Sequence, residues 1–289
     1  MAQPSYSIED LYKEINTING YFGKGDGGYG GTVEFTYGQI HDYCDYRDNP
    51  GIFKCQDYLE NASSGVIYVL KNLKKYNLEY DKLAEYAILW LRYKLNQKHP
   101  YNYTKLNDFY TRHIEKNRYY NNKIKGDDSL TYKEIINTKK ELMDIKEMTK
   151  FSYPFNLLLL LYDKNSKKSG NCTHLDYAKK FADEFEKLNN DSNINWNASY
   201  RKLLFTLSDD YNNLKNKCTD FPPLPEIKTP PSKLIPVLST FSVIPVFLGI
   251  AYKTIYKKKT KKIKEEIENE YMIRRTVIIP GTVIMIDIC

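Results

Sequence analysis

The sequence of 289 residues lacks the short motifs that usually identify an enzyme. Its four histidines occur in no H-E-x-x-H pair, and neither a G-x-S-x-G turn nor a G-x-x-x-x-G-K-[ST] phosphate loop is present. The acidic pairs Asp127-Asp128 and Asp209-Asp210 are interpreted as solvated charges of loops and helix ends. We therefore assign no catalytic residue, no cofactor and no metal, and we do not expect an enzyme.

Nucleotide-binding and metal-binding patterns are equally weak. The segment 23–28, GKGDGG, formally matches G-x-G-x-x-G. A helical pattern precedes it and no helical pattern follows at once, so we interpret it as a flexible glycine loop. His41-x-x-Cys44 and Cys172-x-His174 could each supply two zinc ligands, but neither is a C-x-x-C pair and they lie far apart in the sequence. No zinc site is expected.

Strand-like patterns are lacking before residue 273, and helical patterns recur instead. Apolar residues follow a helical spacing over residues 8–18, 56–76, 79–97, 175–188 and 203–214. Weaker or shorter helices are expected over 104–117 and near 37–46. Residues 1–221 are therefore expected to form an all-α, multi-helix bundle of about eight to ten helices, long enough to bury a sizeable core.

Local signals also set helix boundaries in the middle of the chain. Thr131 and Glu134 form a capping box, and the helix behind them is expected to continue through Met148. Pro154 is expected in the first turn of the next helix, where a missing amide costs least. That helix contains five consecutive leucines and is expected to be central in the core.

Residues 234–252 form an uncharged apolar run. Nineteen residues at about 1.5 Å each span roughly 28 Å, close to the ~30 Å hydrocarbon core of a bilayer. We expect a single transmembrane helix here, with a buried core helix as the alternative. A proline-rich stalk at 222–233 precedes it, and a cytoplasmic tail, 253–289, follows. Lysine excess marks the cytoplasmic side of a span, and the lysines that flank this one are Lys253, Lys257, Lys258, Lys259, Lys261, Lys262 and Lys264.

The formal net charge of +7 is concentrated in this tail. Residues 253–264 carry seven lysines and no acidic residue, whereas the chain before the run is nearly neutral. Such a cluster attracts anionic membrane lipid by about 1 kcal/mol per lysine, so a nucleic-acid partner is not expected. The first fifteen residues have neither a basic nor an apolar region of a signal peptide. We expect no cleaved signal, so that either the single span also directs targeting or the protein uses another export route.

Four of the five cysteines lie before the apolar run: Cys44, Cys55, Cys172 and Cys218. Four cysteines allow three pairings. Pairing 44 with 55 and 172 with 218 is favoured because each bridge closes a compact unit, and free core thiols remain the alternative. Cys289 is the last residue and so cannot start a C-a-a-X prenylation signal.

Sequons place candidate glycosylation acceptors at Asn61, Asn102, Asn171 and Asn197. Asparagine is so abundant in this chain that chance matches explain them equally well.

Several blocks, in the same order, resemble the Plasmodium interspersed repeat (PIR) proteins, the Vir/Yir/Cir/Bir group. The resemblance covers roughly residues 37–260. The blocks are EYAILWLRYKL (85–95), KEMTKF (146–151), NCT (171–173) with YAKKF (177–181), DSNI (191–194), LLFTLSDDY (203–211) and TFSVIPVFLGIAYK (240–253).

The resemblance implies a variant antigen of a multigene family of malaria parasites. It implies a disulfide-stabilised helical ectodomain displayed at or near the surface of the infected red cell, without enzymatic activity. Its partners would be the lipid bilayer and host cell-surface or immune proteins, contacted through the polar loops 23–36 and 118–130. One alternative is an intracellular structural or trafficking protein in a parasite or vacuolar membrane. A more remote one is a helical bundle that binds lipid or another small molecule.

Two features depart from the family pattern. Many members have a further cysteine close to the N-terminus, and residues 1–11 here contain none. The tail also ends in an apolar stretch, Thr276–Ile288, instead of basic residues. This stretch is too short for a second span, and it is interpreted either as a peripheral apolar tail or as read-through past a splice junction.

Overall fold

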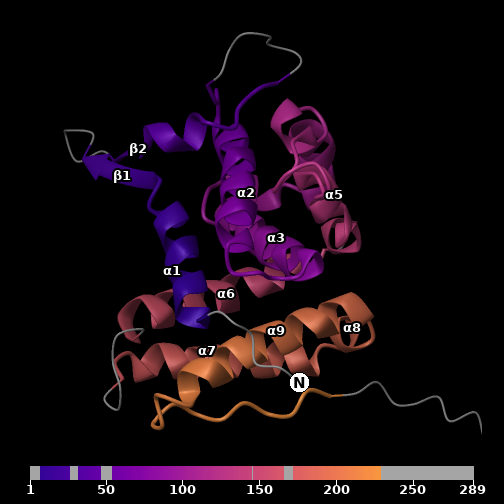
Figure 1. Ribbon diagram of the computed structural model, residues 1–289. Coiled ribbons are helices and arrows are strands. Elements are labelled where there is room, and N and C mark those ends of the chain that lie inside the picture. The colour runs from indigo at the N-terminus through magenta and orange to yellow at the C-terminus, as the bar shows by residue number, and fades with distance from the viewer. Residues whose placement is uncertain (1–6, 27–31, 47–53, 145, 166–171, 229–289) are drawn as a thin grey trace, which may run out of the picture. The chain divides into compact units, whose positions relative to one another are not determined.

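The computed structural model describes residues 7–26, 32–46, 54–144, 146–165 and 172–228. The described residues all belong to one compact unit, Met1–Pro230. In these ranges helices dominate (Figure 1). The main helices are α1 (Ile8–Asn19), α2 (Tyr58–Lys74), α3 (Tyr80–Asn96), α5 (Tyr132–Asn137), α6 (Met148–Asn165), α7 (Leu175–Asn190) and α9 (Ala198–Lys215).

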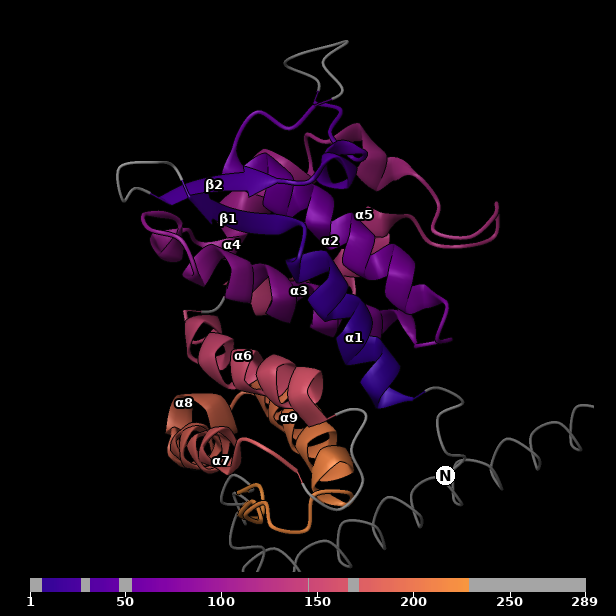
Figure 2. The ribbon, with the colours of Figure 1, turned by 90° about the vertical axis from the view of Figure 1, so that its left-hand side faces the viewer.

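Helices α3 and α6 form the centre of this unit. α3 packs against α2, α5 and α6, whereas α6 also packs against α1, α7 and α9. Figure 2 shows α6 between α3 on one side and α7 and α9 on the other. Every residue from Leu83 to Leu95 of α3 is buried. A helix that is buried on nearly all sides must be surrounded by other elements, and the central position of α3 provides this.

The start of α6 differs from the expectation. The capping box at Thr131 and Glu134 is present, but α5 ends at Asn137 and a 3₁₀ turn, η5 (Lys140–Asp144), follows. Asn and Thr are weak helix formers, and the Thr138 hydroxyl donates to the Ile135 carbonyl at 2.7 Å, which competes with helix continuation. Met148 therefore begins α6, and Pro154 lies inside that helix instead of in its first turn.

A two-stranded antiparallel hairpin corrects the all-α expectation. Strand β1 (Phe22–Asp26) pairs with β2 (Thr32–Thr36), and Phe22 lies opposite Thr36. The supposed flexible glycine loop is thus partly a strand. β-Branched and aromatic residues in β2 favour this conformation, whereas the two glycines of β1 weaken the strand pattern in the sequence. The unit is mostly helical, with one small sheet among the residues described.

Two other expected helices are shorter or less regular than predicted. Near 37–46 the structure has only the 3₁₀ turn η1 (Gly38–His41). Within 104–117 it has one α-turn, α4 (Leu106–Phe109), followed by a π-helical turn, η3 (Tyr110–Ile114). Short 3₁₀ segments η2 (Tyr101–Tyr103) and η4 (Arg118–Asn121), and the short helix α8 (Ser192–Asn195), complete the described elements.

The helical unit extends past the predicted boundary at residue 221. The Tyr211 hydroxyl donates to the Pro222 carbonyl at 2.9 Å. The Asn189 side chain donates to the Glu226 carbonyl at 2.8 Å and accepts from the Lys228 amide at 2.9 Å. The buried side-chain amide of Asn189 thus pairs with one carbonyl and one backbone amide of residues 226–228. The first half of the expected stalk is therefore held against α7.

The expected transmembrane run, 234–252, lies outside the described residues, as do the tail 253–289 and its lysines. Among the helices that the structure does describe, none is long and apolar enough to cross a bilayer.

Candidate binding site

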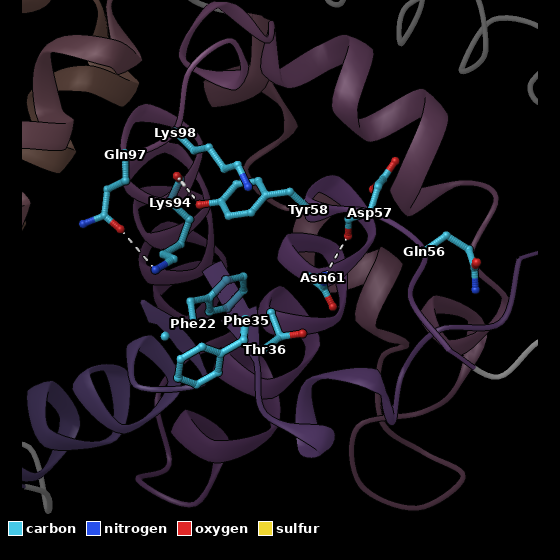
Figure 3. A pocket seen from close by; sticks show the side chains of 11 residues that line it. Phe22, Phe35, Thr36, Gln56, Asp57, Tyr58, Asn61, Lys94, Gln97 and Lys98 are labelled. Carbon is cyan, nitrogen blue, oxygen red and sulfur yellow. Dashed lines mark hydrogen bonds between the residues drawn. The ribbon is translucent and has the colours of Figure 1, made fainter. Parts of the chain in front are cut away.

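A cavity of about 480 Å³ lies where the beginning of α2 and the end of α3 meet the hairpin (Figure 3). This volume is within the range of about 300–1,000 Å³ that is typical of small-ligand sites. The described residues that line it include three aromatic rings, several amides and two lysines: Phe22, Gly23, Phe35, Thr36, Gln56, Asp57, Tyr58, Asn61, Lys94, Gln97 and Lys98.

Capping and one long-range hydrogen bond bring the two helix ends together. Asp57 is the N-cap of α2, and its carboxylate accepts from the Glu60 amide at 2.8 Å. The next residue, Tyr58, donates its hydroxyl to the Lys94 carbonyl near the end of α3 at 2.7 Å. Its ring stacks on Tyr101 with centroids 5.2 Å apart. These contacts fix one wall of the cavity.

The hairpin supplies the other wall. Phe22 meets Tyr58 edge to face, with ring centroids 5.8 Å apart. The Phe35 ring lies directly against Gly23, and a methyl group at position 23 would overlap it. Glycine at this position therefore allows the Phe35 ring to lie across β1, where it borders the cavity (Figure 3).

Two lysines contribute positive charge to the cavity. The Lys94 side chain is buried, donates to Gln97 Oε1 at 3.1 Å, and places its ammonium 4.3 Å from the centre of the Phe22 ring. The Lys98 ammonium lies 4.8 Å from the centre of the Tyr58 ring. Cations are favoured over ring faces and near the C-terminus of a helix, which is where α3 places both.

The side chain of Asn61 is only 8% exposed, and its amide is half satisfied. Its Nδ2 donates to the Asp57 carbonyl at 2.8 Å, whereas its Oδ1 is buried and has no hydrogen-bond partner. In Figure 3 this oxygen points away from Asp57, on the side of Thr36. An unpaired buried acceptor is costly, so a ligand group that donates to this atom would be favoured.

The asparagines of the predicted sequons lie in different surroundings. Asn61 is a poor acceptor for a glycan, because its amide nitrogen is buried in a helix and bonded to the backbone. Asn197 is the N-cap of α9, and its Oδ1 accepts from the amides of Ser199 and Tyr200. Asn102 is half-buried beside the cis peptide bond His99-Pro100. Asn171 lies outside the described ranges.

The two disulfides join the cysteines that the sequence analysis paired. Cys44 bonds to Cys55 and Cys172 bonds to Cys218, with Cα atoms 5.2 and 5.4 Å apart. The first bridge fixes the segment that leads into α2, and the second connects the segment before α7 to the end of α9. Because these cysteines are bonded to each other, they do not form the zinc pairs considered with His41 and His174.

Asp210 corrects the interpretation of the acidic pairs. Asp127 and Asp128 are exposed, but the Asp210 side chain is only 4% exposed. It accepts from the Tyr12 hydroxyl at 2.7 Å and the Tyr86 hydroxyl at 3.0 Å. Burial raises its pKa to about 7, although both hydrogen bonds act in the opposite direction. Enclosed by α1, α3 and α6, this carboxyl is a core group out of reach of a substrate.

The fold and the cavity define a disulfide-bonded helical domain with a pocket at its surface. Residues 12–253 match the profile of the Plasmodium variant antigen proteins Cir/Yir/Bir, so the chain belongs to this family. A solved structure of a Plasmodium PIR protein ectodomain is similar to it, with 29% identity and a TM-score of 0.55. That match covers 77% of this chain and 99% of the solved one. No curated protein matches the chain. The family resemblance is thereby confirmed.

The resemblance could not indicate the cavity. The signal available in the sequence was the pair of lysines near the end of the 79–97 helix together with the aromatic residues around position 22. Those segments are far apart in the chain, and only the packed hairpin brings them together.

Proposed function

We propose that this variant antigen is a single-pass membrane protein whose helical ectodomain recognises host molecules outside the parasite. In this proposal residues 234–252 form the anchor and residues 253–289 the cytoplasmic tail. The protein acts by binding and by sequence variation under immune pressure, not by catalysis.

The observation that carries the outward orientation is the pair of disulfides in one domain. Disulfides form and persist in oxidising compartments and outside cells, whereas cytosolic thiols are kept reduced. Cys44–Cys55 lies in the first half of the described unit and Cys172–Cys218 in the second. A domain built on them is suited to the extracellular side of a membrane.

The described surface supports recognition through the hairpin region. Phe35 and Tyr37 are 42% and 51% exposed, and their rings contact each other edge to face. Large exposed aromatic side chains are enriched where proteins meet partners. The loop 118–130 is more polar, and its tip at Asp127 and Asp128 is exposed.

Trypsin treatment of intact infected red cells tests this display. The ectodomain contains many exposed lysines, so it should be cleaved together with a known surface protein. If the ectodomain stays intact while the surface control is cleaved, display on the host membrane is wrong.

Alkylation before and after reduction, followed by mass spectrometry, tests the orientation separately. Protein taken from infected cells should show Cys44, Cys55, Cys172 and Cys218 modified only after reduction. Free thiols at these four positions would favour an intracellular structural or trafficking role instead.

A further inference from the structure

The cavity next to the hairpin offers apolar ring surface to a ligand. Phe35 is the most exposed of its rings, at 42%. Phe22 and Tyr58 meet edge to face and add apolar ring surface to the lining of the cavity. Ring surfaces of this kind suit the C–H faces of a small ligand.

Uncharged polar groups surround the same space. Gln56, Gln97 and Thr36 border it, and Asn61 contributes the buried Oδ1 that lacks a donor. The amide nitrogen of Asn61 is already bonded to the backbone, so this side chain is held with its acceptor unused. A ligand hydroxyl is the group that would supply the missing donor.

Two ammonium groups among the described lining residues favour an anionic group on the ligand. The ammonium groups of Lys94 and Lys98 lie over the Phe22 and Tyr58 rings. Asp57 also borders the cavity, and its carboxylate accepts the Glu60 amide as a helix cap. A carboxylate or sulfate on the ligand would gain from both ammonium groups.

From these three features together we infer that the cavity binds an acidic sugar, a single carboxylated or sulfated unit of a glycan. Its C–H face packs on Phe35, a hydroxyl donates to Asn61 Oδ1, and its anionic group lies near Lys94 and Lys98. The inference deepens the proposed function and rests on it only for the source of the sugar, which would be a host glycan.

Isothermal titration of the purified full chain in detergent tests the inference with defined probes. The probes are a sialylated trisaccharide, a sulfated disaccharide, neutral lactose and an acidic peptide. At least one acidic sugar should bind with a Kd below about 10 mM, and at least about tenfold more tightly than lactose. The first two probes show which anionic group is preferred.

Two substitutions should weaken this binding by about fivefold to tenfold each, Phe35→Ala by removing the stacking surface and Lys98→Met by removing a charge. Phe35→Tyr and Lys98→Arg should retain it. The matched controls are Trp196→Ala, an aromatic residue that is 70% exposed, and Lys187→Met, whose side chain is 69% exposed. Neither control residue lines the cavity.

The inference is overturned if no acidic sugar binds, if lactose binds equally well, or if only the acidic peptide binds. It is also overturned if Phe35→Ala and Lys98→Met bind like the unmodified chain. Unchanged melting temperatures show that the variants are folded. The titration measures sugar binding by the purified protein and does not depend on where the protein is displayed. Absence of binding would therefore overturn this inference alone, and the trypsin experiment decides surface display.

Discussion

Tyr12 of α1 donates its hydroxyl to the carboxylate of Asp210 in α9 at 2.7 Å, across 198 positions of the sequence. Tyr86 of α3 donates to the same carboxylate, and the Tyr162 hydroxyl of α6 donates to the Asp210 carbonyl at 2.6 Å. Asp210 thus joins four helices in the core through hydrogen bonds, all of them from tyrosines.

Asp210 makes the stability of the domain depend on pH. Its pKa is about 7 in the folded chain, because burial disfavours the charged form, and near 3.9 in an unfolded one. Between these values the folded state holds one more proton, so the contribution of Asp210 to stability falls as pH rises. The free energy of unfolding, relative to Asp210→Asn, should drop by up to about 1.4 kcal/mol per pH unit between pH 5 and pH 7.

Urea unfolding of both proteins at pH 5, 6 and 7 measures this difference. A difference that is constant across the three pH values would show that Asp210 is ionised throughout.

Gly65 in α2 is required by the ring of Trp90 in α3. A methyl group at position 65 would overlap Cη2 of that ring and lie 2.8 Å from its Cζ3, and Trp90 is fully buried. Gly65→Ala should therefore destabilise the domain by about 1–3 kcal/mol through overpacking.

Gly38→Ala is the matched control, because nothing lies within 4 Å of a methyl group there. It should change the free energy of unfolding by less than about 0.5 kcal/mol. Equal melting temperatures for the two variants would contradict the packing described for α2 and α3.

Lys139, in the turn between α5 and η5, forms a buried ion pair with Glu85 of α3. Their charged atoms lie 3.0 Å apart, and their side chains are 5% and 3% exposed. Burial acts to lower the pKa of Lys139, but its bonds to Glu85 and Asp81 more than offset this, so the pKa is raised. Lys139→Met should cost about 3 kcal/mol, since it removes the buried cation beside Glu85 and leaves that carboxylate with the half-exposed Lys82 and the Thr206 hydroxyl.

The exposed pair of Lys187 and Glu184 provides the comparison. Lys187→Met should leave the free energy of unfolding nearly unchanged in the same urea experiment, because exposed ion pairs contribute little to stability. Similar costs at the two positions would argue against the buried pair.

The two disulfides should contribute unequally to stability. They close loops of 11 and 46 residues. On the chain-entropy estimate the short bridge contributes about 3 kcal/mol and the long one about 4 kcal/mol. Replacing Cys172 and Cys218 by serine should therefore lower the melting temperature more than replacing Cys44 and Cys55. The reverse order, measured by calorimetry, would contradict this.

The sequence predicted the elements that depend on local pattern. The apolar stripe predicted over 79–97 is buried and the capping box at Thr131 is present, but the structure also buries Glu85, Arg92 and Lys94 of the same helix. The hairpin was missed because each strand is five residues long and β1 contains glycines, which weaken strand signals. Glu85 and Tyr86, which belong to the block 85–95 that resembles the PIR family, stabilise the core through a buried ion pair and a hydrogen bond.

The candidate site depended on contacts that no local pattern encodes. Asp210 was taken for a solvated charge because its partners Tyr12 and Tyr86 are 198 and 124 positions away. Asn61 was considered only as a glycosylation acceptor. Its unpaired Oδ1 becomes visible only once α2 is packed beside the hairpin.

In the proposed topology the described helical unit lies on the outer side of the membrane, and the lysine-rich segment 253–264 lies on the cytoplasmic side. Labelling of intact infected cells with a membrane-impermeant amine reagent, followed by mass spectrometry, tests it most directly. The account predicts label on exposed lysines such as Lys13 and Lys187, and on Lys253–Lys264 only after permeabilisation. Label on the 253–264 lysines of intact cells, or none on the helical unit, would contradict it.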